Sequence, residues 1–232
     1  QEEIFVGRTD ISQRIEKLIL SPRCPPLLLY GQRRMGKTSL LKNLSRLLPH
    51  HIVPIYIDLQ GAPALATDED EFAHAIAQSA SQAIESNTDL RLDISADTVK
   101  SLTTLNQWLK RLQQKLGGRV GLLMLDEIEV LNELLQTRKL DELRVMSLIR
   151  HIIQNQTHIK LLLTSSFDVK ELASWATYLI NVQVVPISYL DETSARKLIE
   201  QPIPNFPLRY HSTAVEHVLW LTRCHPALMQ LL

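Results

Sequence analysis

A glycine-bounded loop at residues 31–39 is the part of this sequence with the clearest chemical content. It reads Gly-Gln-Arg-Arg-Met-Gly-Lys-Thr-Ser and fits the phosphate-binding pattern G-x-x-x-x-G-K-[ST]. Backbone N–H groups of such a loop converge on a phosphate at the positive end of the helix that follows. Gly31 and Gly36 permit backbone angles and a close approach that a Cβ would block. The loop therefore predicts a binding site for phosphate groups.

Individual residues of this loop have distinct predicted roles. The Lys37 ammonium is expected to reach the β- and γ-phosphates of a nucleotide, and the Thr38 hydroxyl is expected to ligate Mg²⁺. Arg34, Met35 and Ser39 belong to the same cradle and are predicted to contact the nucleotide. Because the backbone forms the cradle, the arginine side chains are expected to face solvent or a partner.

Two acids follow the apolar run at residues 122–125. Burying an unpaired carboxylate is costly, so Asp126 and Glu127 need a reason to stand at the end of a buried strand. A nucleotide-bound Mg²⁺ supplies one: Asp126 would hold the metal, directly or through water, and Glu127 would polarise the attacking water. The structural alternative is an acidic N-cap for the next helix, which the phosphate-binding loop makes the weaker interpretation.

The elements that would position these residues alternate between apolar runs and helical patterns. Strands are expected at residues 26–30, 52–59, 120–125, 159–163 and 180–185. This alternation predicts a mainly parallel, three-layer α/β sheet. The loop would then lie at the carboxyl end of a strand, where such sheets bind ligands.

Some local patterns predict finer detail. Pro54 indicates an edge strand or a strand start, because proline cannot donate a ladder hydrogen bond. Alternating apolar residues at Leu90, Leu92 and Ile94 predict a short extra strand, and a short helix is expected at 169–175.

Beyond Pro186 the alternation of strands and helices stops. Helices are expected at 191–200, at 212–222 and from Pro226 onward. We therefore divide the chain into a nucleotide-binding core at 1–185 and the start of a helical lid at 186–232.

The bulk composition excludes several classes of protein. Lys and Arg total 25, as do Asp and Glu, so no overall positive field indicates nucleic acid. Cys24 and Cys224 are too few and too far apart for a disulfide framework. With no membrane-length apolar run and no signal peptide, we expect a cytoplasmic protein without a membrane partner. Both ends of the sequence are expected to be cut from something longer.

At this point the chain resembles the AAA+/STAND ATPases, and more narrowly the AAA-like ATPase domains of bacteria and archaea. The resemblance covers nearly all of the chain. Residues 5–8 match the family's entry motif, 31–39 match Walker A, and 122–127 match Walker B with its catalytic Glu. Residues 161–165 match the sensor-1 strand, and 221–228 resemble the lid motif.

This resemblance implies a P-loop NTPase sandwich with a five-stranded sheet of order 5-1-4-3-2, followed by a small helical lid. It implies slow ATP hydrolysis, with ATP or ADP and Mg²⁺ as cofactors. Glu127 and Lys37 would be catalytic, and Thr164 or Ser165 would orient the water or the γ-phosphate. The residues expected to border the base are Phe5, Val6, Arg8 and Pro226.

The sequence also departs from the family pattern. The run at 164–167, Thr-Ser-Ser-Phe, lacks the arginine that STAND proteins often carry there. Arg223 and Cys224 stand where the lid motif usually has a glycine, and Arg223 is interpreted as a solvated charge. Arg144 and Arg150 lie where AAA+ arginine fingers tend to occur, and both are interpreted as surface charges.

Three functions compete. The first is a regulatory switch in which the nucleotide controls how residues from 186 onward pack, and so controls homo-oligomerisation and flanking effector or sensor domains. The second is a DNA-associated AAA+ ATPase of the origin-recognition or transposition-targeting type, which the zero net charge disfavours. The third is a small-molecule kinase, which the acidic pair and the helical lid disfavour. Adenine is favoured over guanine by the resemblance alone, since no N-K-x-D motif is present.

Overall fold

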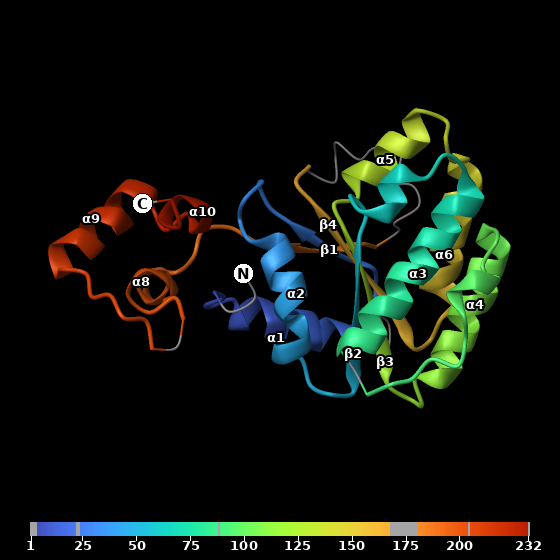
Figure 1. Ribbon diagram of the computed structural model, residues 1–232, viewed down its shortest axis with the longest axis horizontal. Coiled ribbons are helices and arrows are strands. Elements are labelled where there is room, and N and C mark those ends of the chain that lie inside the picture. The colour runs from blue at the N-terminus through green and yellow to red at the C-terminus, as the bar shows by residue number, and fades with distance from the viewer. Residues whose placement is uncertain (1–3, 22–23, 88, 168–180, 204, 232) are drawn as a thin grey trace.

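Five parallel strands form one sheet in the computed structural model, which describes residues 4–21, 24–87, 89–167, 181–203 and 205–231. Their order is β2-β3-β4-β1-β5 (Figure 1), which confirms the predicted fold and is the predicted order read from the other edge. Pro54 lies on the edge strand β2, as its missing N–H predicts. The strands are β1 Leu27–Tyr30, β2 Ile52–Asp58, β3 Val120–Asp126, β4 Ile159–Ser165 and β5 Gln183–Pro186.

Helices cover both faces of this sheet. Helices α1 (Thr9–Ile19) and α2 (Lys37–Leu47) pack on one face. The other face carries α3 (Glu69–Asn87), α4 (Leu102–Lys115), α5 (Glu129–Gln136) and α6 (Glu142–Asn155) (Figure 1). Short 3₁₀ helices occupy Ala62–Leu65 and Ala96–Thr98.

Successive residues of a strand point to opposite faces of the sheet. Leu27 and Leu29 pack with α1 and α2, whereas Leu28 between them packs with the helices opposite. This two-sided burial explains why the strands read as continuous apolar runs rather than as alternating patterns.

The predicted extra strand is wrong. Residues 89–95 form no strand in the structure, and Leu90, Leu92 and Ile94 lie partly buried against the core cluster beneath α3 and α4. Alternation reports burial on one side of an extended segment, and here helices rather than a neighbouring strand supply that burial. The helix expected at 169–175 and the first residue of the strand expected at 180–185 lie outside the described residues.

Three helices after β5 form a small separate lobe, which we call the lid (Figure 1). These are α8 (Glu192–Glu200), α9 (Ser212–Thr222) and α10 (Pro226–Met229). They share an apolar cluster of their own, made by Leu190, Ala195, Leu198, Val215, Leu219 and Met229. No described helix of the chain has the length and apolar character needed to cross a membrane.

Candidate nucleotide-binding site

The phosphate-binding loop connects the end of β1 to the start of α2. Its two glycines are required for different structural reasons. Gly36 has φ +85°, and no described heavy atom lies within 4 Å of the Cβ that alanine would add there. Its requirement is therefore conformational. A Cβ on Gly31 would lie 2.2 Å from the Ile187 carbonyl oxygen, so this position needs glycine for close approach of the chain after β5.

Lys37 is buried with its ammonium turned back onto the loop. Nζ donates to the carbonyl oxygens of Gly31 (2.8 Å) and Gln32 (3.2 Å), and to Ser166 Oγ (2.8 Å). These three contacts use all three ammonium donors. Burial lowers the pKa of Lys37, while the nearby carboxylates Glu127, Glu129 and Asp126 act against that effect. A compact positive charge thus lies inside the loop.

The two Walker B acids are joined by Thr164 at the end of β4. Thr164 Oγ1 donates to Asp126 Oδ1 (2.5 Å) and accepts the Glu127 backbone N–H (2.8 Å). The Tyr56 hydroxyl from β2 donates to Asp126 Oδ2 (3.1 Å). Asp126 is only 2% exposed, and these donors compensate the burial of its charge.

Glu127 extends away from this buried network toward the cleft. Its backbone is left-handed, with φ 59°, and Gln60 Nε2 donates to its Oε2 (2.9 Å). Burial raises the pKa of Glu127, and the neighbouring charges of Glu129 and Asp126 raise it further. A carboxylate with a raised pKa is a better proton acceptor near neutral pH.

Ser165 does not face the cleft. It is fully buried, and its hydroxyl contacts Glu129 Oε1 (3.1 Å) and accepts the Phe167 N–H (2.9 Å). The next residue, Ser166, donates its backbone N–H to the same Glu129 oxygen (2.5 Å). The serine hydroxyl that reaches Lys37 is therefore that of Ser166.

A cleft of about 720 Å³ lies over the loop, in the size range of small-molecule sites. We call its two sides the core wall and the lid wall. The core wall consists of Arg33, Arg34, Gly36, Lys37, Thr38, Ser39, Gln60 and Glu127. The lid wall consists of Pro226, Ala227, Gln230 and Leu231. Arg33 and Arg34 have exposed side chains, as expected for a loop that binds through its backbone.

A smaller pocket of about 50 Å³ adjoins the cleft on the side of the N-terminal segment. All four residues expected to border the base line it, together with three residues of the loop. These are Phe5, Val6, Arg8, Pro226, Met35, Gly36 and Ser39. The structure thus brings the two ends of the chain together over the loop.

The Arg8 side chain bonds to backbone carbonyl groups, a role that differs from the base contact predicted for it. Its guanidinium donates to the carbonyl oxygens of Met35 (3.2 Å), Ser188 (2.5 Å) and Tyr189 (3.1 Å). Burial lowers the pKa of Arg8. A Cβ on the preceding Gly7 would lie 2.4 Å from Ser194 Oγ in α8. The entry motif therefore connects the phosphate-binding loop to the lid.

A protein-family model described as an AAA domain matches residues 22–201. The chain belongs to the AAA domain family. No curated protein sequence matches it.

Several solved structures resemble this AAA domain. The Walker-type ATPase of Pyrococcus abyssi is 20% identical, with 97% of this chain and 66% of that chain covered and a TM-score of 0.73. The Aeropyrum pernix ORC1 protein in complex with DNA is 16% identical, with 99% and 59% covered and a TM-score of 0.56. The A. pernix ORC2 protein, in ADPNP–ADP complexes, is 14% identical, with 85% and 52% covered and a TM-score of 0.62. At these identities the similarity shows the fold alone, and the chain spans less than two thirds of each of these proteins.

The AAA domain offers oxygen ligands suited to Mg²⁺, namely the Thr38 hydroxyl and the Asp126 carboxylate. The described residues contain no group of three or more His, Cys, Asp or Glu that could hold a metal by themselves. A cation here would need oxygens from a bound phosphate, which is how Mg²⁺ is commonly held in nucleotide sites.

Four polar residues of the site lie outside the sequence motifs that predicted it: Tyr56, Gln60, Glu129 and Ser166. Tyr56 and Gln60 reach the acids because β2 pairs with β3, with Asp58 opposite Asp126. A lone tyrosine in the apolar run of β2 and a third acid after Walker B are the signals that could have identified two of them. Ser166 is hidden in a run of three hydroxyl residues.

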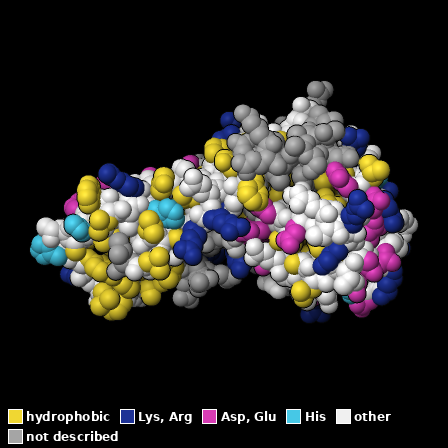
Figure 2. All heavy atoms as spheres, turned by 90° about the horizontal axis from the view of Figure 1, so that it is seen from above, with side chains coloured by type: hydrophobic (Ala, Val, Ile, Leu, Met, Phe, Trp, Pro, Cys, Tyr) yellow, Lys and Arg dark blue, Asp and Glu magenta, His cyan; other side chains and the backbone are white. Residues whose placement is uncertain are grey.

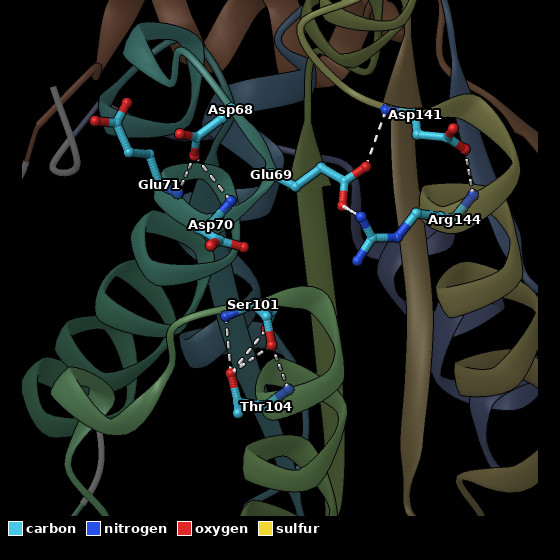
Figure 3. Close-up of polar contacts among 8 residues, drawn as sticks. All are labelled: Asp68, Glu69, Asp70, Glu71, Ser101, Thr104, Asp141 and Arg144. Atoms are coloured by element: carbon cyan, nitrogen blue, oxygen red, sulfur yellow. Dashed lines mark hydrogen bonds and ion pairs between the residues drawn. The ribbon is translucent and has the colours of Figure 1, made fainter.

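The arginines interpreted as surface charges have local partners. Arg144 pairs with Glu69 Oε2 (2.6 Å), and the other Glu69 oxygen accepts the Asp141 N–H (3.2 Å) (Figure 3). This network joins the first turns of α3 and α6, beside a groove of about 770 Å³ that is separate from the nucleotide cleft. The Arg223 guanidinium lies 5.7 Å from the Trp220 ring centroid, in the lid.

Proposed function

We propose that this AAA domain binds ATP with Mg²⁺ and hydrolyses it slowly, as a nucleotide-controlled switch within a larger protein. One observation carries the proposal. The Lys37 ammonium and the Asp126–Thr164–Glu127 network lie at the ends of neighbouring strands, beside a cleft whose opposite wall comes from the lid. Such an arrangement suits a ligand that carries phosphates and must be attacked by water.

In this proposal each group has one role. The loop amides and Lys37 bind the β- and γ-phosphates, and Thr38 and Asp126 hold Mg²⁺, which neutralises developing negative charge. Glu127 accepts the proton of the attacking water, and Gln60 orients its carboxylate through the 2.9 Å hydrogen bond. Thr164 fixes both acids relative to each other, whereas Ser165 bonds to Glu129 and does not face the cleft.

The switch follows from the two walls of the cleft. We propose residues 1–185 as the nucleotide-binding core and 186–232 as the start of the lid. A ligand between them gains contacts with Pro226 and Gln230 only when the lid is close, so it favours that arrangement by its difference in affinity. We propose that this change controls self-association and the flanking domains of the full protein.

Glu127→Gln tests the hydrolytic assignment. The amide keeps the shape and the hydrogen-bonding oxygen but cannot accept a proton, so ATP hydrolysis should fall about 100-fold or more. The Kd for ATP should stay within a few-fold of the unsubstituted domain, because the phosphate-binding groups are intact. Phosphate release and calorimetric titration measure the two quantities. Glu133→Gln, at an exposed position of the helix α5 that follows Glu127, is the matched control.

Hydrolysis by E127Q at the unsubstituted rate would show that Glu127 is not the base. Sedimentation velocity of E127Q with ATP, with ADP and without nucleotide then tests the switch. A larger species with ATP alone supports it, and identical profiles in all three states contradict it.

DNA association is the second candidate, and the fold similarity to the A. pernix ORC1 protein in complex with DNA is what favours it. The balanced charge of 25 basic and 25 acidic residues supplies no general attraction to phosphates. Binding to a duplex that weakens steeply between about 50 and 200 mM salt would support this function. No binding at the lower salt concentration would leave the switch as the better proposal.

A further inference from the structure

A third carboxylate beside the Walker B pair, that of Glu129, contacts the turn after β4 rather than the cleft. We infer that Glu129 is a positioning residue: it holds this turn so that the Ser166 hydroxyl occupies the Lys37 donor that a nucleotide phosphate must take. The inference rests on the proposed function, in which Lys37 binds phosphate, and it adds a competition within the protein for that lysine.

The competition begins with the hydrogen bonds of Lys37. An ammonium has three donors, and those of Lys37 go to the Gly31 oxygen, the Gln32 oxygen and Ser166 Oγ. A phosphate oxygen that binds Lys37 must therefore displace one of these acceptors. The ammonium is buried, so a donor released without a new partner would be costly.

Ser166 is the acceptor that can leave. The Gly31 and Gln32 carbonyls belong to the loop backbone, and Gly31 is itself confined by the chain at Ile187 and by its N–H bond to the Ser165 oxygen (3.3 Å). A serine hydroxyl, by contrast, moves by rotation about one side-chain bond. The arriving phosphate would thus exchange with the Ser166 hydroxyl and leave the loop unchanged.

Glu129 keeps Ser166 in place for this role. Its Oε1 accepts the Ser166 backbone N–H (2.5 Å) and contacts the Ser165 hydroxyl (3.1 Å), so one carboxylate oxygen fixes two successive residues. Its other oxygen is buried and has no hydrogen-bond partner among the described residues. The carboxylate is therefore committed to the turn, and the turn positions the hydroxyl on Lys37.

Removing the competitor should tighten nucleotide binding. In Ser166→Ala one Lys37 donor is free before the nucleotide arrives, and the net value of an ordinary hydrogen bond predicts a Kd for ADP lower by about threefold to tenfold. Glu129→Ala should produce a similar gain, because the released turn no longer holds the hydroxyl on the lysine. Calorimetric titration with ADP measures each Kd.

The E129A/S166A double variant separates positioning from simple charge. If Glu129 acts through Ser166, the double variant should bind ADP no more tightly than either single variant. Glu129→Gln should restore the Kd of the unsubstituted domain, since its amide oxygen still accepts from the turn although the charge is gone. Glu133→Ala, which removes one exposed acid from the same helix, should leave the Kd unchanged.

Three results would contradict the inference. Equal Kd values for ADP in S166A and the unsubstituted domain would overturn the competition for Lys37. Additive decreases in Kd in the double variant would overturn the link through Ser166, and an equal decrease in E129Q and E129A would assign the effect to charge. If E129A fails to fold by circular dichroism, the S166A and E129Q pair still decides. An unsubstituted domain that binds neither ADP nor ATP would instead refute the proposed function.

Discussion

The two walls of the nucleotide cleft are built in different ways. The core wall stands at the ends of β1, β2 and β3, and its polar groups are joined by hydrogen bonds such as Gln60 to Glu127 at 2.9 Å. The lid wall rests on α10, a helix of four residues, and on its flanking positions. Figure 2 shows apolar side chains gathered over the lid lobe, where Trp220 is 61% and Leu231 is 71% exposed.

Left-handed backbone occurs on both sides of the cleft. The core wall has it at Gly36 (φ 85°) and at Glu127 (φ 59°), and the turn between α9 and α10, next to the lid wall, has it at Arg223 (φ 51°) and Cys224 (φ 61°). Left-handed backbone costs an L-residue about 1 kcal/mol or more, and glycine avoids that cost. The walls therefore differ in hydrogen bonding rather than in backbone strain: the core wall contains the buried Lys37 with three hydrogen bonds, and the lid wall rests on a four-residue helix. Substitutions should therefore have larger effects on the core wall.

Lys37→Ala should have the largest effect on function. It removes the only buried ammonium described in the loop and with it the charge-assisted bonds to phosphate, so ADP should bind about 100-fold more weakly or worse. Calorimetric titration checks this, with Lys110→Ala, at an exposed position of α4, as the control. Similar Kd values for both variants would mean that the core wall does not bind the phosphates.

Gly31→Ala should have the largest effect on folding. Its Cβ would overlap the Ile187 backbone oxygen at 2.2 Å, and the strand ends must separate to admit it. We expect the free energy of unfolding to fall by about 2–4 kcal/mol in urea titrations. Gly117→Ala is the control for conformation without overlap, with φ 60° and open space in the described structure, and should cost about 1 kcal/mol. Equal losses would contradict the close approach.

Cys224→Gly should have a small effect of the opposite sign. Relief of the left-handed conformation gains about 1 kcal/mol, and the extra entropy of glycine in the unfolded chain offsets part of it. The net stabilisation should be roughly 0.5 kcal/mol in thermal or urea unfolding. Cys224→Ala loses the same thiol but keeps the strained backbone, so it should show no such gain. A gain in both variants would place the effect in the thiol.

Asp191→Ala should produce a small, pH-dependent loss in the lid. Asp191 Oδ1 accepts the Ser194 N–H (2.8 Å) at the start of α8, and the hydrogen bonds from Ser194 lower the pKa of Asp191. A lowered folded-state pKa stabilises above the unfolded value near 4 and stops doing so as pH falls through the folded value. The loss should be about 1 kcal/mol at pH 7 and smaller once the pH falls below the folded-state pKa of Asp191. Asp191→Asn, which keeps the cap, should unfold much like the unsubstituted domain at either pH.

The sequence predicts the phosphate-binding loop better than the contacts between separate strand ends, for physical reasons. Gly31, Gly36 and Lys37 stand at fixed spacing because a single short loop must form the phosphate cradle. Glu129 and Ser166 come from different strand ends, and their meeting depends on the parallel register of β3 and β4, which a local pattern does not encode. Alternating apolar residues around Leu92 predicted a strand because alternation alone does not distinguish a strand partner from a helix surface.

One peptide group links the core to the lid from both sides. The Tyr189 carbonyl accepts from Arg8 of the entry motif (3.1 Å), and the Leu190 N–H donates to the Cys224 oxygen in the lid (3.0 Å). The group is planar, so the two bonds cannot turn independently about it. A large outward rotation of the lid must break one of them. The Leu190 amide should therefore exchange with deuterium at a rate that reports how often its bond to the Cys224 oxygen opens, and a bound nucleotide should slow that exchange.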